Sequence, residues 1–243
     1  MKNNKYSAVM NIIKKTFNDG KKDYFVIGIS GGIDSAVALK MLINCFGKQK
    51  IKAYYLPIES NPINKKDVSL ISKHLDIKIE CIDLTKLFKK TVKTFKIHNK
   101  NNCYNLKPKL RFIYLSSLAF ENNALIVSCL NYDEYYLGYF TKNGDSLGDV
   151  YPLLNFSKSE IYELAQEFKL PAEIINKTPS ADLYCGQTDE AELGINYHDL
   201  DNYLQYQKVP SNVEQKIKTW HKINSHKHTL QKFIIPQNNL RKN

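Results

Sequence analysis

The chain has 243 residues, 43% of them hydrophobic and 12% aromatic, and this composition excludes an intrinsically disordered protein. A chain of this length buries a substantial core, as one large domain or two small ones. The net charge of +11 is compatible with a nucleic-acid partner, but the lysines are scattered along the whole chain. The scatter favours a generic basic surface over a nucleic-acid interface.

The cysteines and the apolar runs indicate the cellular compartment. The five cysteines form no C-x-x-C pair, which is typical of reduced thiols in a cytosolic protein. No apolar run approaches the roughly 18 residues that span a bilayer. The first residues also lack the apolar segment of a signal peptide. We therefore expect a cytoplasmic protein without a membrane partner.

Helices and strands are expected to alternate along the chain. Apolar residues at helical spacing predict an amphipathic opening helix over residues 5–18. Short apolar and β-branched runs predict strands over residues 24–29, 51–57, 78–83 and 124–130. Further helices are expected over residues 35–46, 65–75, 85–95, 110–122, 196–206 and 211–224, and an Asn-rich loop over 98–105. The alternation predicts an α/β fold, a doubly wound and mostly parallel sheet with helices on both faces.

The stretch GISGGIDS, residues 28–35, lies between the first strand and the next helix. Its glycines let a ligand approach the backbone, and the N–H groups of the turn and helix start converge on one point, which should hold a phosphate. The stretch matches neither the Walker-type nor the dinucleotide-binding pattern. Asp34 would repel a bare phosphate, so we expect a divalent cation, Mg²⁺ by default, between them. The plainer alternative is a turn that only leads a strand into a helix.

A second group of residues follows the fourth expected strand. Ligands of parallel sheets bind at the carboxyl ends of the strands, so Ser30, Pro57 and Cys129 should converge on one cleft. Glu134 is placed to be a second metal carboxylate opposite Asp34. The alternative for Glu134 is an ordinary acid in the first turn of a helix.

The last third of the chain contains a capping box, a polar loop and a basic end. Residues 157–160 (SKSE) are typical of a capping box that opens a helix. Within it, Lys158 either reaches an ATP phosphate or caps a solvated helix end, and the residues alone favour the second role. The polar stretch 178–192 has the character of a lid. Residues 225–228 (SHKH) lack the ligand spacing of a metal site and favour a solvated basic turn.

Several separate stretches resemble one family. They are SGGIDS (30–35), LGYFTKNGD (137–145), KTPSADL (177–183), GQTDEAELG (186–194) and the closing SHKH. In this order they resemble the ammonia-dependent NAD synthetases, which belong to the N-type ATP pyrophosphatases. The resemblance implies one adenine nucleotide alpha hydrolase-like domain over residues 1–243, with a five-stranded sheet. The length leaves no room for the glutaminase domain of glutamine-using relatives, so free ammonia is the expected nitrogen donor.

The resemblance also implies a reaction. Nicotinic acid adenine dinucleotide (deamido-NAD) would be amidated to NAD through an acyl-adenylate, with release of AMP and pyrophosphate. The expected partners are therefore ATP, deamido-NAD and ammonia, together with a second copy of the chain in a homodimer. The opening helix and the helix after Pro108 would lie at the dimer interface.

The resemblance assigns roles to individual residues. Asp34 and Glu134 would hold Mg²⁺. ATP would be bound by Gly28, Ile29, Ser30, Gly31, Gly32, Ile33, Asp34, Ser35, Cys129, Lys158 and Ser180. Deamido-NAD would be contacted by Lys109, Arg111, Lys142, Asp149, His226 and Lys227. Lys109 stands where the family has Arg, which is not equivalent at a bidentate anion site, so Arg111 is the second candidate there. Cys129 stands where the family usually has Thr.

Two other functions remain open from the residues alone. One is a tRNA-modifying adenylase that uses the same loop, and the other is a non-catalytic nucleotide-binding module. No side chain offers itself as a covalent nucleophile. Catalysis should therefore rest on positioning and electrostatic stabilisation.

Overall fold

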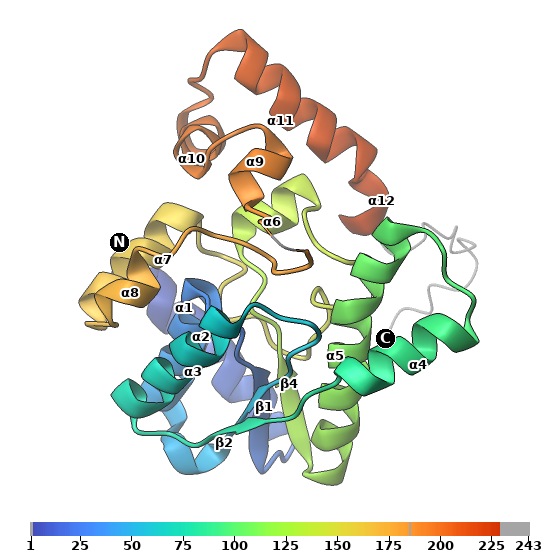
Figure 1. The fold of residues 1–243 in the computed structure, drawn as a ribbon. Coiled ribbons are helices and arrows are strands. Elements are labelled where there is room, and N and C mark those ends of the chain that lie inside the picture. The colour runs from blue at the N-terminus through green and yellow to red at the C-terminus, as the bar shows by residue number, and fades with distance from the viewer. Residues whose placement is uncertain (1, 185, 229–243) are drawn as a thin grey trace, which may run out of the picture.

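The computed structural model describes residues 2–184 and 186–228 (Figure 1). Its sheet consists of four parallel strands, β1 (Tyr24–Gly28), β2 (Ile51–Tyr55), β3 (Ile79–Cys81) and β4 (Ala124–Val127). They lie in the order β3-β2-β1-β4, so the order reverses at β1. In such sheets a ligand binds beyond the carboxyl ends of the strands, at the point where the order reverses. The predicted α/β fold with a parallel sheet is confirmed, and β1 leads into the reversal point.

The expected fifth strand is wrong within the described residues. At its place next to β4 there is only an isolated parallel bridge between Val127 and Val150. Asp149 prevents a regular ladder there, because its Oδ2 atom accepts the N–H of Ile126 at 2.8 Å. Gly148 also passes so close to β4 that a Cβ atom on it would lie 2.8 Å from the Ser128 nitrogen.

Helices cover both faces of the sheet. They are α1 (Lys2–Asp19), α2 (Ile33–Phe46), α3 (Pro62–Leu75), α4 (Thr85–Thr94), α5 (Lys100–Glu121), α6 (Tyr132–Leu137), α7 (Lys158–Glu167), α8 (Ala172–Ile175), α9 (Asp189–Leu193), α10 (Tyr197–Tyr206), α11 (Ser211–Ile223) and α12 (Ser225–His228), with a 3-10 turn η1 (Lys48–Lys50). Side chains alternate along each strand, so Phe25 and Ile27 face α1 and α2 while Val26 faces α4 and α5. This alternation produces two apolar layers, one on each face.

A third apolar cluster lies apart from the sheet. It joins α6, α9, α10 and α11 through Leu137, Leu193, Leu200 and Ile217. We call these four helices, together with α12, the helical cap. Figure 1 shows the cap beyond the end of the sheet at which α6 begins. The fold therefore places the reversal point of the sheet beneath the cap.

Helix α5 begins ten residues earlier than the sequence suggested. The stretch 98–105 is not a loop, because α5 starts at Lys100. The side chain of Asn99 caps this start by accepting the N–H of Asn102 at 3.0 Å. Cys103 and Leu106 then continue the apolar face of the helix into the sheet layer. Cys103, Leu106 and the N-cap residue Asn99 therefore stabilise a helix start that the polar composition of the segment does not predict.

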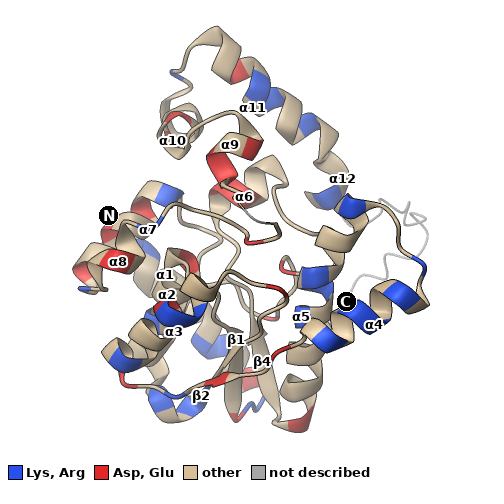
Figure 2. Cartoon of the chain, viewed as in Figure 1, with Lys and Arg blue, Asp and Glu red and all other residues tan. Residues whose placement is uncertain are grey.

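The surface carries basic residues on many elements. Figure 2 shows Lys and Arg spread over helices on all sides of the view, as the scatter along the sequence predicted. No helix in the described part of the chain is both long and apolar enough to cross a membrane.

Candidate active site

Residues 28–35, which we call the phosphate loop after the ligand that the sequence predicts there, connect β1 to α2. Hydrogen bonds of the serines within the loop hold its conformation. The Ser35 hydroxyl donates to the Gly32 carbonyl at 3.1 Å and accepts the N–H of Ser30 at 3.2 Å. Gly31 has a positive φ of 86°, and a Cβ atom there would lie 3.0 Å from the Asn64 carbonyl oxygen. Gly32 precedes α2 without a side-chain cap, so the first N–H groups of the helix remain available. This arrangement suits the binding of an anion.

A lysine and two carboxylates gather beside this loop. The Nζ atom of Lys158 lies 2.6 Å from Asp34 Oδ2, and Asn131 Nδ2 donates to Asp34 Oδ1 at 3.0 Å. Burial alone would lower the pKa of Lys158, but the charges of Asp34 and Glu134 outweigh it and raise this pKa. Lys158 therefore remains a cation, and the role favoured by its residue pattern alone, a solvated helix end, is wrong.

Glu134 has the helix-capping role considered for it, and the charge of Asp34 also acts on it. It is the third residue of α6 and forms a capping box with Asn131, whose N–H it accepts at 3.2 Å. Burial, and next the negative charge of Asp34, raise the pKa of Glu134 well above its usual range. Two half-buried carboxylates that repel each other fit a hard divalent cation between them. The donor set therefore suits Mg²⁺.

Cys129 lies close to the same carboxylates. Its thiol is partly buried, and burial followed by the charges of Asp34 and Glu134 raises its pKa above the ordinary value. A thiol with a raised pKa is a poor nucleophile. The raised pKa therefore agrees with the expectation that no side chain acts as a covalent nucleophile.

The predicted capping box of α7 is confirmed. Glu160 N donates to Ser157 Oγ at 3.4 Å, and Ser157 N donates to Glu160 Oε2 at 2.9 Å. The box fixes the first turn of α7, where Lys158 is the first residue. It therefore aims Lys158 at the phosphate loop.

Two buried aspartates support the same turn, and sequence reasoning missed them. Asp133 Oδ2 accepts the N–H of Lys158 at 2.7 Å, and Asp201 Oδ2 accepts the N–H of Ser159 at 3.0 Å. Burial, and next the charge of Asp201, raise the pKa of Asp133 to about 8. The first backbone N–H groups of every helix need acceptors, and this was the only signal for Asp133 and Asp201. The sequence does not show that the acceptors for α7 come from residues so distant in the chain.

The base of the expected lid is attached to α3. Lys177 Nζ lies 2.6 Å from Asp67 Oδ2 and donates to Asn64 Oδ1 at 2.8 Å and to the Gly31 carbonyl at 3.2 Å. Asp182 accepts the Asn64 side-chain amide at 2.7 Å. Ser180 is exposed and accepts the N–H of Asp182 at 3.1 Å. The described contacts do not bring Ser180 to the Lys158–Asp34 pair.

Three of the basic residues expected at the dinucleotide lie near one another, namely Lys142, His226 and Lys227. Lys142 Nζ donates to the carbonyl of His226 at 2.7 Å. Lys227 Nζ donates to the carbonyls of Gly138 and Phe140 at 2.7 and 2.9 Å. The expectation of a solvated basic turn over residues 225–228 is wrong, because they form α12 and Lys227 is partly buried.

The remaining expected contacts come from α5 and from the segment that follows the Gly144 turn. Arg111 is partly buried, and its Nε atom donates to the Leu56 carbonyl at 3.0 Å just beyond β2. Lys109 lies against the Gly144 turn, since a Cβ atom on Gly144 would be 3.2 Å from the Lys109 nitrogen. One carboxylate oxygen of Asp149 is committed to β4. The site therefore combines an anion-binding loop, a paired carboxylate group and a separate basic group.

Comparison with known proteins gave consistent matches. The sequence profile of the family described as NAD synthase matches residues 5–232. The NH(3)-dependent NAD(+) synthetase of Finegoldia magna is 40% identical over 197 residues, which cover 79% of this chain and 81% of that protein. The structure of NMN synthetase from Francisella tularensis has a TM-score of 0.88 and 31% identity, covering 96% of this chain and 97% of the other. The NH3-dependent NAD synthetase of Campylobacter jejuni subsp. jejuni has a TM-score of 0.77 at 22% identity, covering 95% and 97%.

Proposed function

Because the chain belongs to the NAD synthase family, we infer that it is a ligase that amidates deamido-NAD to NAD with ATP and ammonia. The observation that carries this inference in the structure is the Lys158–Asp34 pair with Glu134 beside the phosphate loop. A carboxylate is a poor electrophile, so the nicotinate oxygen first attacks the α-phosphorus of ATP. Pyrophosphate leaves, ammonia attacks the acyl-adenylate carbonyl, and AMP is released.

We propose that the N–H groups of residues 28–35 and the Lys158 cation bind the ATP phosphates. With ATP bound in this way, both would lie where negative charge grows on the departing pyrophosphate, and fixed donors at such a place lower the barrier. Cys129 and Ser180 are the further proposed ATP contacts. Cys129 is supported by its closeness to Asp34, whereas Ser180 must approach from the segment 178–192.

Asp34 and Glu134 are proposed to hold Mg²⁺. Their mutual repulsion and oxygen donors fit this ion, which is usually held by one or two carboxylates together with substrate phosphates. When bound, the ion would offset charge on the pyrophosphate. The lid over residues 178–192 is proposed to exclude water that would hydrolyse the adenylate.

We propose that Lys142, His226 and Lys227 contact the dinucleotide, together with Lys109 and Arg111 from α5 and with Asp149 beside β4. The meeting of Lys142 with His226 across the chain supports this grouping. We further propose that the described residues act as a single ligase domain and that this domain uses free ammonia directly. The proposed location is the cytoplasm. The four described cysteines are free thiols, which suits a reducing compartment.

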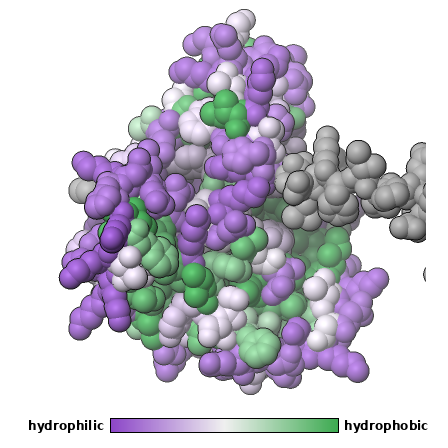
Figure 3. All heavy atoms as spheres, turned by 90° about the vertical axis from the view of Figure 1, so that its right-hand side faces the viewer, coloured by the Kyte–Doolittle hydropathy of each residue, from purple (hydrophilic) through white to green (hydrophobic). Residues whose placement is uncertain are grey.

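A homodimer is part of the proposal. Ile12 on α1 is 67% exposed, and Ile113 and Phe120 on α5 are 61% and 91% exposed. Figure 3 shows apolar side chains on the face of the molecule that carries α4 and α5. Large exposed apolar side chains on such a face favour burial against a second copy.

A second candidate is amidation of the nicotinate mononucleotide, which would yield NMN. It is favoured by the similarity to the NMN synthetase of Francisella tularensis, which extends over nearly the whole chain. The chemistry at the carboxylate would be identical, and the two substrates differ only in the attached AMP group.

One assay tests both candidates. Purified protein is incubated with Mg-ATP, ammonium and either deamido-NAD or the mononucleotide, and NAD, NMN and AMP are quantified. The main proposal predicts NAD and AMP in equal amounts. A higher kcat/KM with the mononucleotide would favour the second candidate. AMP formation that responds to tRNA but to neither nucleotide would instead indicate a tRNA-modifying adenylase. Binding of ATP without turnover would indicate a non-catalytic module.

A further inference from the structure

Side chains from the C-terminal helices donate to the backbone carbonyls at the end of α6. The donors are His228 Nε2 to Tyr135 O at 2.5 Å, His221 Nδ1 to Tyr136 O at 2.8 Å, Asn224 Nδ2 to Leu137 O at 3.0 Å, and Lys227 Nζ to the oxygens of Gly138 and Phe140. A carbonyl oxygen only accepts, so each of these imidazole nitrogens carries the proton. We call His221, Asn224, Lys227 and His228 the carbonyl clamp.

Helix α6 needs such support because it is short. A helix of six residues is marginal by itself, and its last carbonyls have no partner within the helix. Donors and cations at the carboxyl end of a helix also interact favourably with its dipole. The clamp therefore supplies hydrogen-bond donors to the last carbonyls of α6, which have no partner within the helix.

The clamp residues are themselves held in place. The ring of His221 stacks between Tyr136 and His228, with centroid distances of 4.4 and 5.2 Å and interplanar angles of 22° in both pairs. Asn224 is only 8% exposed. Gly138 has a positive φ of 66°, and a Cβ atom on it would lie 2.3 Å from the Cβ atom of Asn224. This close approach brings α11 and α12 onto the end of α6.

The opposite end of α6 carries Glu134. The side chain and N–H of Asn131 fix that end through the capping box, and the clamp fixes the other end. We propose that His221, Asn224 and His228 are positioning residues that hold α6 so that Glu134 faces Asp34. The proposal rests on the metal role proposed above for Glu134. Lys227 is left out of this set because it is itself a proposed dinucleotide contact, for which its ammonium has a third N–H beyond the two given to carbonyls.

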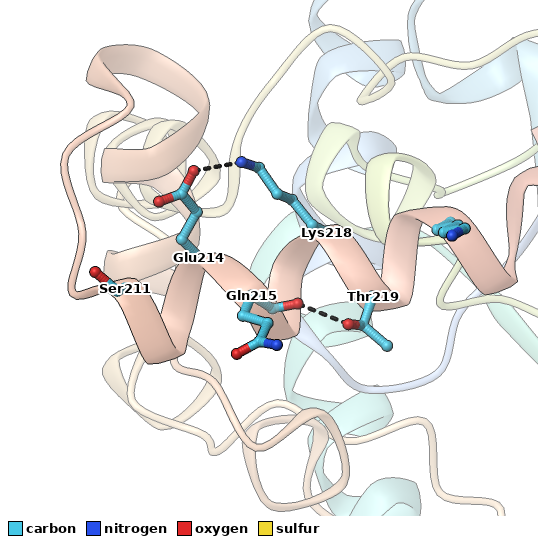
Figure 4. Close-up of a pocket in the computed structure, with 6 residues that line it drawn as sticks. Ser211, Glu214, Gln215, Lys218 and Thr219 are labelled. Atoms are coloured by element: carbon cyan, nitrogen blue, oxygen red, sulfur yellow. Dashed lines mark hydrogen bonds and ion pairs between the residues drawn. The ribbon is translucent and has the colours of Figure 1, made fainter.

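The exposed face of α11 provides a matched control. A hollow of about 390 Å³ lies on this face, and its lining side chains all come from α11, as Figure 4 shows for those it labels. The hydrogen bond and the ion pair described for them stay within α11: Lys218 pairs with Glu214 at 2.6 Å, and Thr219 donates to the Gln215 carbonyl at 2.7 Å. A substitution such as Gln215→Ala changes α11 without touching the clamp.

The test compares variants that remove a donor with variants that keep it. His221→Leu and His228→Leu keep much of the bulk but cannot donate. His221→Asn places an amide nitrogen near the former Nδ1 position, and His228→Gln places one near the former Nε2 position. Gln215→Ala is the control. Two quantities are measured: amide hydrogen exchange over residues 131–142, and the Mg²⁺ concentration that gives half-maximal activity.

In the leucine variants we expect α6 amides to exchange about fivefold faster, the equivalent of one lost hydrogen bond. The Mg²⁺ demand should rise about tenfold, as for other residues that orient a metal ligand. The Asn and Gln variants should recover most of both effects, and Gln215→Ala should match the wild type. Should one leucine variant fail to fold, the other carries the test, since each removes a separate carbonyl contact.

Three results would overturn the proposal. Unchanged exchange in the leucine variants would show that the clamp does not hold α6. Equally faster exchange in β1 would show that the clamp supports the whole fold. Faster exchange in α6 with an unchanged Mg²⁺ demand would leave Glu134 independent of it. Failure of the proposed function would look different. If the wild type did not amidate either nucleotide, the difference in α6 exchange between wild type and leucine variants would remain. Metal binding would then be compared through Mn²⁺ affinity, measured from water relaxation, in place of the Mg²⁺ demand of the activity.

Discussion

Lys158 and Asp34 form an ion pair of 2.6 Å between residues that lie 124 positions apart in the chain. The lysine side chain is only 1% exposed, so water screens its charge weakly. The capping box of α7 and two buried aspartates hold the first turn of the helix from which this lysine extends. The pair places a fixed cation next to the phosphate loop before any nucleotide arrives.

Replacing this cation should impair the chemical step. For Lys158→Met we expect kcat to fall about 10²- to 10³-fold, as when one fixed donor to a developing charge is removed. Steady-state formation of NAD measures the effect, and circular dichroism checks the fold. Lys218→Met is the control, since this exposed lysine pairs only with its helical neighbour Glu214 among the contacts described. A kcat for Lys158→Met within a factor of about two of the wild type would show that the phosphates do not need this cation.

Asp34→Asn should abolish turnover while the fold stays intact. The amide cannot offset the charge of a divalent cation, and its single oxygen can accept from Asn131 or from Lys158 but cannot replace both carboxylate oxygens. We expect activity below about one hundredth of the wild type, even at raised Mg²⁺. The matched control is Asp76→Asn, which affects an exposed carboxylate paired with Lys48. Near-normal activity of the Asp34 variant would remove this residue from the proposed metal site.

Asp133 predicts a pH dependence of stability. Its pKa is about 8 in the folded protein and about 3.9 when unfolded, so the folded state binds the proton more tightly. The resulting stabilisation is complete below pH of about 4 and is lost as the pH rises toward 8. Asp133→Asn removes this titration. Between about pH 5 and 8 the urea midpoint of the wild type should therefore fall relative to that of the variant. Parallel midpoints over this range would contradict the prediction.

The proposed dimer can be tested at α5. Ile113→Glu places a charge on a side chain that is 61% exposed, and burying that charge in an interface would be costly. We expect light scattering to show a dimer for the wild type and a monomer for the variant. Tyr206→Glu, at the end of α10, is an equally exposed apolar control that should remain dimeric. A wild type that is monomeric at micromolar concentration would contradict the proposal.

Local patterns predicted the frame of the molecule. The four strands and the helices between them follow from apolar runs and spacing, and the loop with Asp34 was recognisable from glycines between a strand and a helix. The start of α5 could not be recognised in this way. Its first turns are polar and depend on the N-cap at Asn99 and on contacts of Cys103 with the sheet layer. A single bridge at Val150 replaces the expected fifth strand, since Asp149 occupies the donor that a ladder would use.

The contacts that complete the site could not be predicted in this way. The sequence pattern around Lys158 allowed either a solvated cation or a phosphate ligand, and only the tertiary fold brings Asp34 to it. The short stretch 225–228 is polar and basic, so its local pattern favoured a solvated turn. Its actual partners are backbone carbonyls, which exist at every residue and leave no mark in the sequence.

The carbonyl clamp also bears on how the protein is made. His228 leaves the ribosome 93 residues after Tyr135, its partner in α6. At ordinary rates of synthesis this interval lasts about 5–20 s. All four strands and the phosphate loop are complete during that time, so the nascent chain can assemble its sheet while α6 still lacks its C-terminal partners. Competence to hold the metal would therefore appear only with the last part of the chain, and a prematurely terminated product would fold its sheet without becoming an active ligase.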